Sequence, residues 1–295
     1  MRSNFLKAQT QLPERTFVRE ARRASGTEGL IGVSLLAVFV TAALFAPLLA
    51  PYDPAAFVGR PLERPGAAFL LGTNDVGQDI LSELLFGARV SLVVAVGAAV
   101  GTVLLGLLVG GVAGYLGGWV DAALMRGVDV LLALPQLPLI ILITTLTGAG
   151  LAQMTLTMAL LFSPGMARII RAQMFNQRGR AYVKIAQRFG ASPLYIFRRH
   201  MLPHLAPLLI VGLVTAAGRA AAMEAGLAFL GLGDPSAKSW GLMMRYALNL
   251  PGLLLTDRWL WWLLPPGLCI TLLILALTFT GMRLEKRLNP GGQSS

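Results

Sequence analysis

Long charge-free apolar stretches alternate with short polar or basic segments along most of this chain. A helix that crosses a membrane needs about 20 consecutive, mostly apolar residues. Five stretches reach that length: 30–50, 90–120, 130–167, 205–231 and 259–282. The third has 38 residues and is divided by Thr147-Gly148-Ala149-Gly150, so we expect two helices in it and six in all.

This pattern predicts an all-α integral membrane protein with six transmembrane helices. The polar segments between the helices divide the chain into five parts. These are a polar N-terminal segment 1–29, a first transmembrane helix 30–50, a loop 51–88, a transmembrane domain 89–282 and a tail 283–295.

Glycines and prolines add detail to the predicted helices. From Gly97 to Gly118, six glycines recur at steps of four or five residues, which lets two helices approach closely. Pro135 and Pro138 are expected to kink the third helix. Such breaks at membrane depth are tolerated where they line a path or are covered by neighbours.

Two charges fall well inside an apolar stretch, at Arg219 and Glu224. An intramembrane charge is costly and usually faces the protein interior or water. A buried pair is one interpretation, but the two residues are five apart, which is poor spacing for pairing on one helix. The other interpretation places both residues, with Pro135 and Pro138, along a translocation path.

A basic segment, 179–203, lies in a window from Phe162 to Met223 that contains no acidic residue. Residues 182, 185, 186 and 189 are apolar or aromatic and share one helical face. Gly190 is placed to end this helix in a left-handed cap, and Ser192-Pro193 to begin a second. Pro203 is expected to end that second helix. We call 179–203 the coupling segment.

Basic residues are distributed unevenly between the two sides of the predicted membrane. With six spans, 18 of them fall on the side of both termini and the coupling segment, and six on the other. Positive residues accumulate in cytoplasmic loops, so we expect both termini in the cytoplasm. Trp259, Trp261 and Trp262 are expected in the opposite aromatic belt, and Arg126 is expected to pair with Asp129.

Composition narrows the class of protein further. The chain has 295 residues, 55% of them hydrophobic, and a net charge of +11. The charges lie between apolar spans, so they indicate membrane topology rather than nucleic-acid binding. One cysteine, Cys269, excludes a disulfide framework, and the first apolar stretch is too long for a secretory signal. Asn74, Asp75 and Asp79 do not have EF-hand spacing and favour a capped turn before a helix.

Several motifs resemble one family. The coupling segment contains a motif that is similar to the EAA loop of ABC-importer permeases. The matching residues are Tyr182-Val183, Ala186, Gly190, His200, Leu202 and Pro203. Residues 71–92 resemble the LGTD-x-x-GRD…S…GARxSL stretch of peptide-type permeases, from which Asn74 and Gln78 depart. Residues 224–233 resemble EAGLSFLGLG, with Ala228 for Ser. From about 50 to 290, the chain is similar to permease subunits of the dipeptide, oligopeptide and nickel importers.

The resemblance implies a five-helix permease core plus an N-terminal span, in the inner membrane. It also implies a second, related permease, two ATP-binding subunits and an extracytoplasmic solute-binding protein as partners. ATP and Mg would be bound by those subunits, because this chain has no phosphate-binding loop and no expected cofactor, metal site or catalytic residue. The residues expected to dock on the ATP-binding subunit are Tyr182, Lys184, Ile185, Ala186, Arg188, Phe189 and Gly190.

Alternatives stay open at this point. The cargo could be peptide, nickel or another small solute. An ion-driven secondary transporter would use Arg219 and Glu224 as a relay, but the inverted repeats of such proteins are not evident. A membrane-embedded enzyme would need a metal or nucleophile cluster, and His200 with His204 offers only two ligands.

Overall fold

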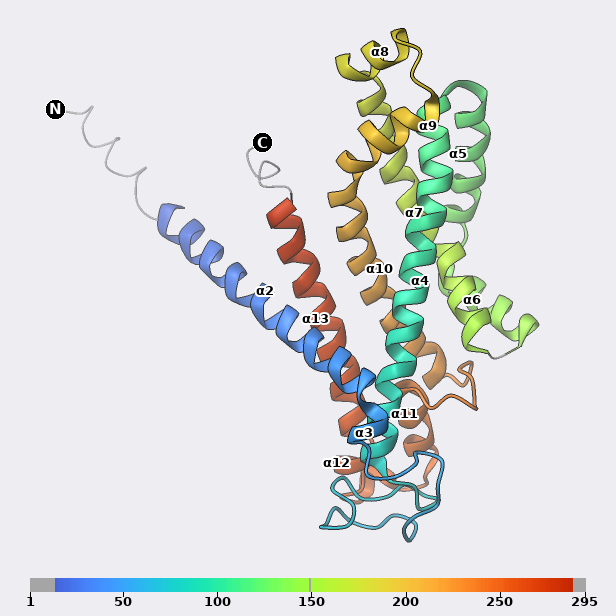
Figure 1. Cartoon of the computed structure of the whole chain (residues 1–295). Coiled ribbons are helices and arrows are strands. Elements are labelled where there is room, and N and C mark those ends of the chain that lie inside the picture. Colours follow the sequence, from blue (N-terminus) through green and yellow to red (C-terminus); the bar gives the residue numbers. More distant parts are fainter. Residues whose placement is uncertain (1–13, 149, 289–295) are drawn as a thin grey trace, which may run out of the picture.

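The computed structural model describes residues 14–148 and 150–288, with side chains described from Thr27 onward. All the regular elements of this part are helical (Figure 1). They are α2 (Glu14–Leu44), α3 (Ala46–Leu49), α4 (Ile80–Leu116), α5 (Gly118–Ala133), α6 (Gln136–Thr147), α7 (Leu151–Arg178), α8 (Ala181–Arg188), α9 (Pro193–Ile196), a π-helical turn (Phe197–Met201), α10 (Leu202–Phe229), α11 (Trp240–Asn249), a 3₁₀ turn (Leu253–Leu255), α12 (Trp259–Trp262) and α13 (Leu264–Leu288).

Within the described ranges, four helical stretches are long and apolar enough to cross a membrane. They are Thr27–Leu44, Ile80–Leu116, Pro193–Phe229 and Trp259–Leu288. Helices α5 and α6 reach the required length only together, and they are bent by 90° at Leu134-Pro135. The expectation of an all-α membrane protein is therefore confirmed, with four or five candidate spans.

The predicted third span differs most from the expectation. Helix α6 has 12 residues and is about 18 Å long, which is shorter than a bilayer core of about 30 Å. The kink expected from Pro135 and Pro138 is a complete break, because Pro135 stands in extended backbone as the N-cap of α6. Helix α7 lies along α4 instead of forming a hairpin with a full-length α6 (Figure 1).

Small residues let α4 and α7 pack closely. A Cβ added at Gly106 would lie 2.8 Å from Met166 Cβ, and one at Gly114 would lie 2.6 Å from Met174 Cβ. At Gly110 the added atom would meet the Ala167 backbone, with the Cα at 2.9 Å. An added Cβ would also lie 2.9 Å from Thr155 at Gly97 and 2.6 Å from Ala159 Cβ at Gly101. The close approach predicted from the glycine spacing is thus confirmed for five of the six positions.

We expect Gly110→Ala to lower the free energy of unfolding by about 1–3 kcal/mol, because the new methyl group meets rigid backbone rather than a movable side chain. Gly127→Ala is the matched control, since a Cβ at Gly127 has no neighbour within 4 Å. Thermal unfolding of the detergent-purified variants measures both changes. Equal stability of the two variants would contradict tight packing at Gly110.

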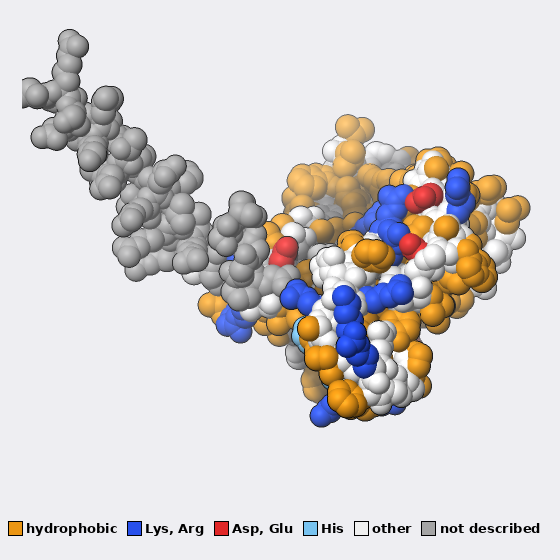
Figure 2. Space-filling model, turned by 90° about the horizontal axis from the view of Figure 1, so that it is seen from above, with side chains coloured by type: hydrophobic (Ala, Val, Ile, Leu, Met, Phe, Trp, Pro, Cys, Tyr) orange, Lys and Arg blue, Asp and Glu red, His pale blue; other side chains and the backbone are white. Residues whose placement is uncertain are grey.

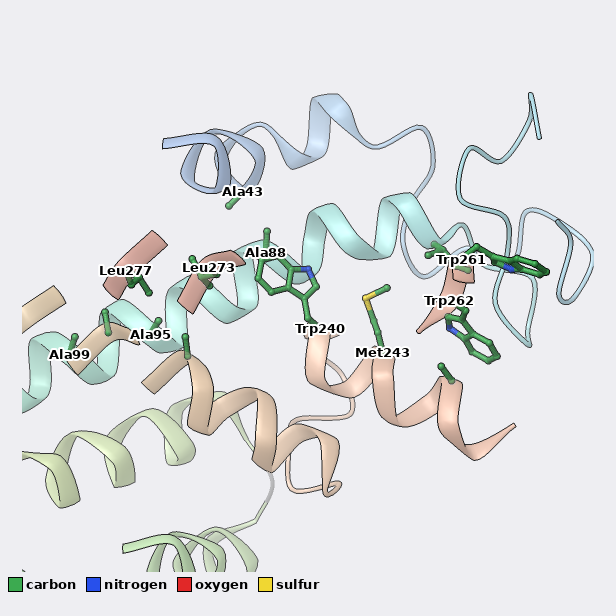
Figure 3. Close-up of a cluster of buried hydrophobic side chains, with 14 of the residues drawn as sticks. Ala43, Ala88, Ala95, Ala99, Trp240, Met243, Trp261, Trp262, Leu273 and Leu277 are labelled. Atoms are coloured by element: carbon green, nitrogen blue, oxygen red, sulfur yellow. The ribbon is translucent and has the colours of Figure 1, made fainter. Parts of the chain in front are cut away.

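The main apolar core lies near the end of the bundle opposite α8. Trp240 at the start of α11 packs against alanines of α4 (Figure 3). Its ring centroid lies 5.5 Å from that of Phe39 of α2. Its indole N–H donates to the Leu84 carbonyl (2.8 Å). Trp261 and Trp262 belong to the same core and are 8% and 1% exposed, so their predicted place in an aromatic belt is wrong.

Both ends of the described chain lie at the α8 end of the molecule. Helix α2 begins there and α13 ends there, whereas residues 51–79, α11 and α12 occupy the other end (Figure 1). Helices α2 and α13 approach closely where Arg283 donates to the Gly29 carbonyl (3.2 Å). The N-terminal segment and the first span are one continuous helix from Glu14.

Candidate functional site

The coupling segment folds locally as its sequence predicts. Helix α8 ends before Gly190, whose φ of +78° is left-handed. The Gly190 amide donates to the Gln187 carbonyl and the Ala191 amide to the Ala186 carbonyl, each at 3.0 Å, which closes the cap. Ser192 then accepts from the Tyr195 amide (3.3 Å) as the N-cap of α9. Both predicted caps are confirmed.

The second helix does not end at Pro203, and that prediction is wrong. Helix α9 continues through the π-helical turn into α10, and Pro203 lies in the first turn of α10. In the π turn the Leu202 amide donates to the Phe197 carbonyl, five residues back. The wider turn accommodates the missing N–H of Pro203 without breaking the helix. The coupling segment is therefore joined to α10 without a loop.

The predicted docking residues divide between two faces. Tyr182 and Ala186 are half-buried, and the Tyr182 ring stacks on His204 at 5.7 Å between centroids. Ile185 and Phe189 are 54% and 87% exposed. They share the outer surface with Leu194 and Tyr195 of α9, which are also exposed.

Val183 is the residue that holds α8 to the bundle. It is fully buried, in one cluster with Ile196, Met201 and Leu205. This cluster also includes Ile170 and Met174 of α7, so α8 and α9 both rest on the ends of α7 and α10. The predicted face omitted Val183, although its apolar character in a basic helix was a usable signal.

Basic residues at the α8 end of the molecule form two groups, one that bonds to neighbouring helices and one that is exposed on the surface. Arg171 forms a two-bond ion pair with Asp121 (both 2.5 Å), and Arg168 pairs with Asp129 (2.5 Å). The prediction that Asp129 pairs with Arg126 is therefore wrong, because α5 packs on α7 and brings Arg168 to it. Arg178 donates to the Leu116 carbonyl (3.1 Å) at the end of α4.

The outward basic residues border the exposed apolar side chains of α8 and α9. Figure 2 views this end and shows Lys and Arg side chains crossing a surface that also carries apolar side chains. We define the docking surface as the exposed apolar side chains and their basic border: Lys184, Ile185, Arg188, Phe189, Leu194, Tyr195, Arg198 and Arg199.

The four residues predicted along a translocation path do not form one cluster. Glu224 is 1% exposed and accepts from the Ser91 hydroxyl (3.1 Å) on α4. Arg219 is exposed, lies over the Phe162 ring at 4.3 Å from its centroid, and donates to the Gln136 side-chain oxygen. Pro135 and Pro138 are exposed on either side of Gln136.

Gln136 connects the helix break to the intramembrane arginine. Its amide nitrogen donates to the Leu161 carbonyl of α7 (3.2 Å), while its oxygen accepts from Arg219 of α10. A neutral polar residue between two prolines, within a long apolar stretch, was the available sequence signal for this contact. A cavity of about 350 Å³ adjoins the site and is lined by Arg219, Phe162 and Thr102, among others.

The opposite end of the molecule contains a buried polar network. Lys238 forms an ion pair with Glu83 and also donates to Gln78 and to the Pro54 carbonyl. The Asn74 amide donates to Gln78 (2.9 Å) and Glu83 (3.0 Å).

Beside this network, α4 begins with a side-chain cap. Asp79 accepts from the Ser82 amide (2.8 Å), which confirms the predicted capped turn. In the adjoining loop, hydrogen bonds donated by Ser236 lower the pKa of Asp234. The two polar loops at this end, 71–79 and 234–239, are thus fixed by side-chain hydrogen bonds.

Comparisons with known proteins agree with this architecture. Residues 103–291 match the family model of the binding-protein-dependent transport system inner membrane component. The chain is 35% identical over 268 residues to the di/tripeptide transport system permease protein of Pseudomonas aeruginosa, covering 88% of this chain and 86% of that protein. It is 34% identical to the dipeptide transport system permease proteins of Bacillus subtilis and Haemophilus influenzae, over 88% of this chain and 81% and 90% of theirs.

The residues matched by the family model include the docking surface, Arg219 with its partners Gln136 and Phe162, and Lys238. The alignments to the three permeases cover 88% of the chain. The chain belongs to the family of inner-membrane permease components of binding-protein-dependent transport systems.

Proposed function

We propose that this chain is the permease subunit of an ATP-driven peptide importer and forms one half of its pore. The observation that carries the proposal is the identity of 34–35% to dipeptide and di/tripeptide permeases over 88% of the chain. A second, related permease completes the pore. Two ATP-binding subunits supply the energy, and an extracytoplasmic binding protein delivers the peptide.

In the membrane, we propose six crossings with both termini in the cytoplasm. Helices α2, α4, α7, α10 and α13 are five of the crossings, and the bent pair α5–α6 together makes the sixth. The excess of basic residues at the α8 end supports this orientation. ATP is in the cytoplasm, so the docking surface must face that side.

Motion of the ATP-binding subunits reaches the pore through the docking surface. Ile185 and Phe189 contact an apolar cleft of the partner, and Lys184 and Arg188 pair with acidic residues at its rim. Tyr182, Ala186 and Gly190 maintain the shape of the segment. Because α9 continues into α10 without a loop, displacement of the segment is transmitted directly to α10.

Reconstitution of the complete complex tests the function. Proteoliposomes that contain both permeases, the ATP-binding subunits and the binding protein are expected to accumulate a labelled dipeptide only with internal ATP. An uncoupler that collapses ion gradients is expected to leave uptake unchanged. Uptake driven by an ion gradient without ATP would contradict the proposal.

We expect Phe189→Ala to weaken association with the ATP-binding subunits about 10- to 100-fold. Full burial of a large apolar side chain contributes about 1.5–3 kcal/mol, which corresponds to that range. Leu255→Ala is the matched control, because Leu255 is 91% exposed at the opposite end of the molecule. Binding of purified ATP-binding subunit to permease in nanodiscs measures both, and equal affinities would contradict the assigned surface.

A further inference from the structure

Arg219 carries a charge at a depth where charges are costly. It lies ten residues before the end of α10, about 15 Å from the outer end of that helix. This is about half the thickness of a bilayer core. Such a residue faces the protein interior or water and marks a functional position.

The contacts of Arg219 position its charge without neutralising it. Phe162 and Gln136 are both neutral, and Arg219 is absent from the four ion pairs of the described residues. Glu224, the other intramembrane charge, is buried against Ser91 of α4. An arginine has five N–H donors in a planar fork, and Gln136 accepts from one nitrogen only. The remaining donors can bind an anion.

The surroundings of Arg219 are those of a path rather than of a lipid-facing surface. Gln136, which holds Arg219, lies at the break between α5 and α6, and Pro135 and Pro138 beside it are exposed. Irregular backbone at membrane depth occurs only where it is buried in protein or lines a water-filled cavity, and not where it faces lipid. The charge and the backbone break therefore meet at one place.

The adjoining cavity has the size and lining of a small-ligand site. Its volume is about 350 Å³, and pockets for small ligands range from about 300 to 1,000 Å³. Its α10 side runs from Leu208 to Arg219, so the arginine is the lining residue of α10 farthest from the docking surface. Most of the lining is apolar, and the hydroxyl of Thr102 has no hydrogen-bond partner among the described residues.

We propose that Arg219, held by Phe162 and Gln136, binds the carboxylate of the cargo as it passes through the pore. This inference rests on the proposed peptide import. A guanidinium binds a carboxylate through two parallel hydrogen bonds, and stacking on a ring leaves the edge of its fork free. The apolar part of the cavity then accommodates an adjacent side chain of the peptide.

The test compares a peptide that has a free carboxylate with the same peptide as its C-terminal amide. Uptake of both is measured in proteoliposomes of the complete complex, for the wild type, Arg219→Gln, Arg219→Lys and Arg89→Gln. Arg89 is a matched control, because it also lies over an aromatic ring, 5.8 Å from the Phe86 centroid, but does not line the cavity at Arg219. The binding protein is identical in all four preparations, so its own selectivity cancels.

In Arg219→Gln we expect uptake of the free acid to fall about 10- to 100-fold, the range for a lost hydrogen bond to a charged group, with little change for the amide. Arg219→Lys keeps the charge and is expected to retain part of the preference, while Arg89→Gln behaves as wild type. Equal loss for acid and amide would overturn the inference and indicate pairing with an acidic residue of the second permease. Unchanged uptake of the acid would also overturn it.

Failure of the proposed function gives a different result. In that case the wild-type complex would show no ATP-dependent uptake of either peptide. An Arg219→Gln protein that does not assemble leaves Arg219→Lys as the deciding variant. If Arg219→Lys takes up acid and amide in the wild-type ratio, two-bond recognition by arginine is contradicted.

Discussion

Replacing Lys238 with methionine is expected to lower the free energy of unfolding by about 3–5 kcal/mol, the cost of removing one partner from a buried ion pair. Glu83 is 3% exposed, and Lys238 is its cationic partner. Methionine keeps most of the length of the side chain, so packing changes little while the charge is lost. Chemical unfolding of the purified permease, followed by tryptophan fluorescence, measures the change.

Two further variants identify the cause. In Lys238→Met combined with Glu83→Gln, no buried charge is left alone, and we expect most of the stability to return. In Lys238→Met combined with Gln78→Arg, a cation returns beside Glu83, because Gln78 and Glu83 both accept from the Lys238 ammonium group. A single Lys238→Met variant as stable as the wild type would show that Glu83 does not need this partner.

Gly190→Pro is expected to leave membrane insertion intact and to abolish stimulation of the ATPase by loaded binding protein. Proline fixes φ near −65°, whereas Gly190 has φ of +78° and donates its amide to the Gln187 carbonyl. The turn between α8 and α9 therefore cannot form. The docking surface would lose its arrangement while the transmembrane helices remain.

ATP hydrolysis by the reconstituted complex, with and without loaded binding protein, measures this effect. Gly190→Asn is the first control, because asparagine tolerates left-handed backbone. Gly179→Ala is the second, since Gly179 has right-handed backbone and the nearest atom to an added Cβ is 3.6 Å away. Normal stimulation in Gly190→Pro would remove the coupling segment from the mechanism.

Local features of the fold were predictable from the sequence. The caps at Asp79, Gly190 and Ser192 depend on one or two neighbouring residues, and all three are present. The close approach of α4 and α7 follows from glycines four residues apart. These predictions succeed because the physical cause and its effect lie within a few residues of each other.

Contacts between distant residues were not predictable in the same way. Gln136 and Arg219 are 83 residues apart, and Glu83 and Lys238 are 155 apart. No local pattern specifies such a pairing, because it depends on how the helices pack. The burial of Trp261 has the same origin, since α11 and α12 pack together at the end of the molecule opposite α8.

The predicted effects of Pro203 and Pro135 on their helices also differ from the structure. A proline usually ends a helix, but the π-helical turn before Pro203 widens the backbone enough to continue it. The 12-residue α6 shows the opposite case, since Pro135 there interrupts an apolar stretch long enough for a span. Apolar length alone does not distinguish these two outcomes.

The turn at Phe197–Met201 has one further consequence, for the evolution of this permease. A π turn contains one residue more than an α turn and confines that residue to a local bulge of the helix. Loss of a single codon here would therefore leave an ordinary α turn, and α9 and α10 would keep the sides that they present to their neighbours. Among homologous genes, single-residue deletions within these five positions should be more frequent than deletions elsewhere in α10.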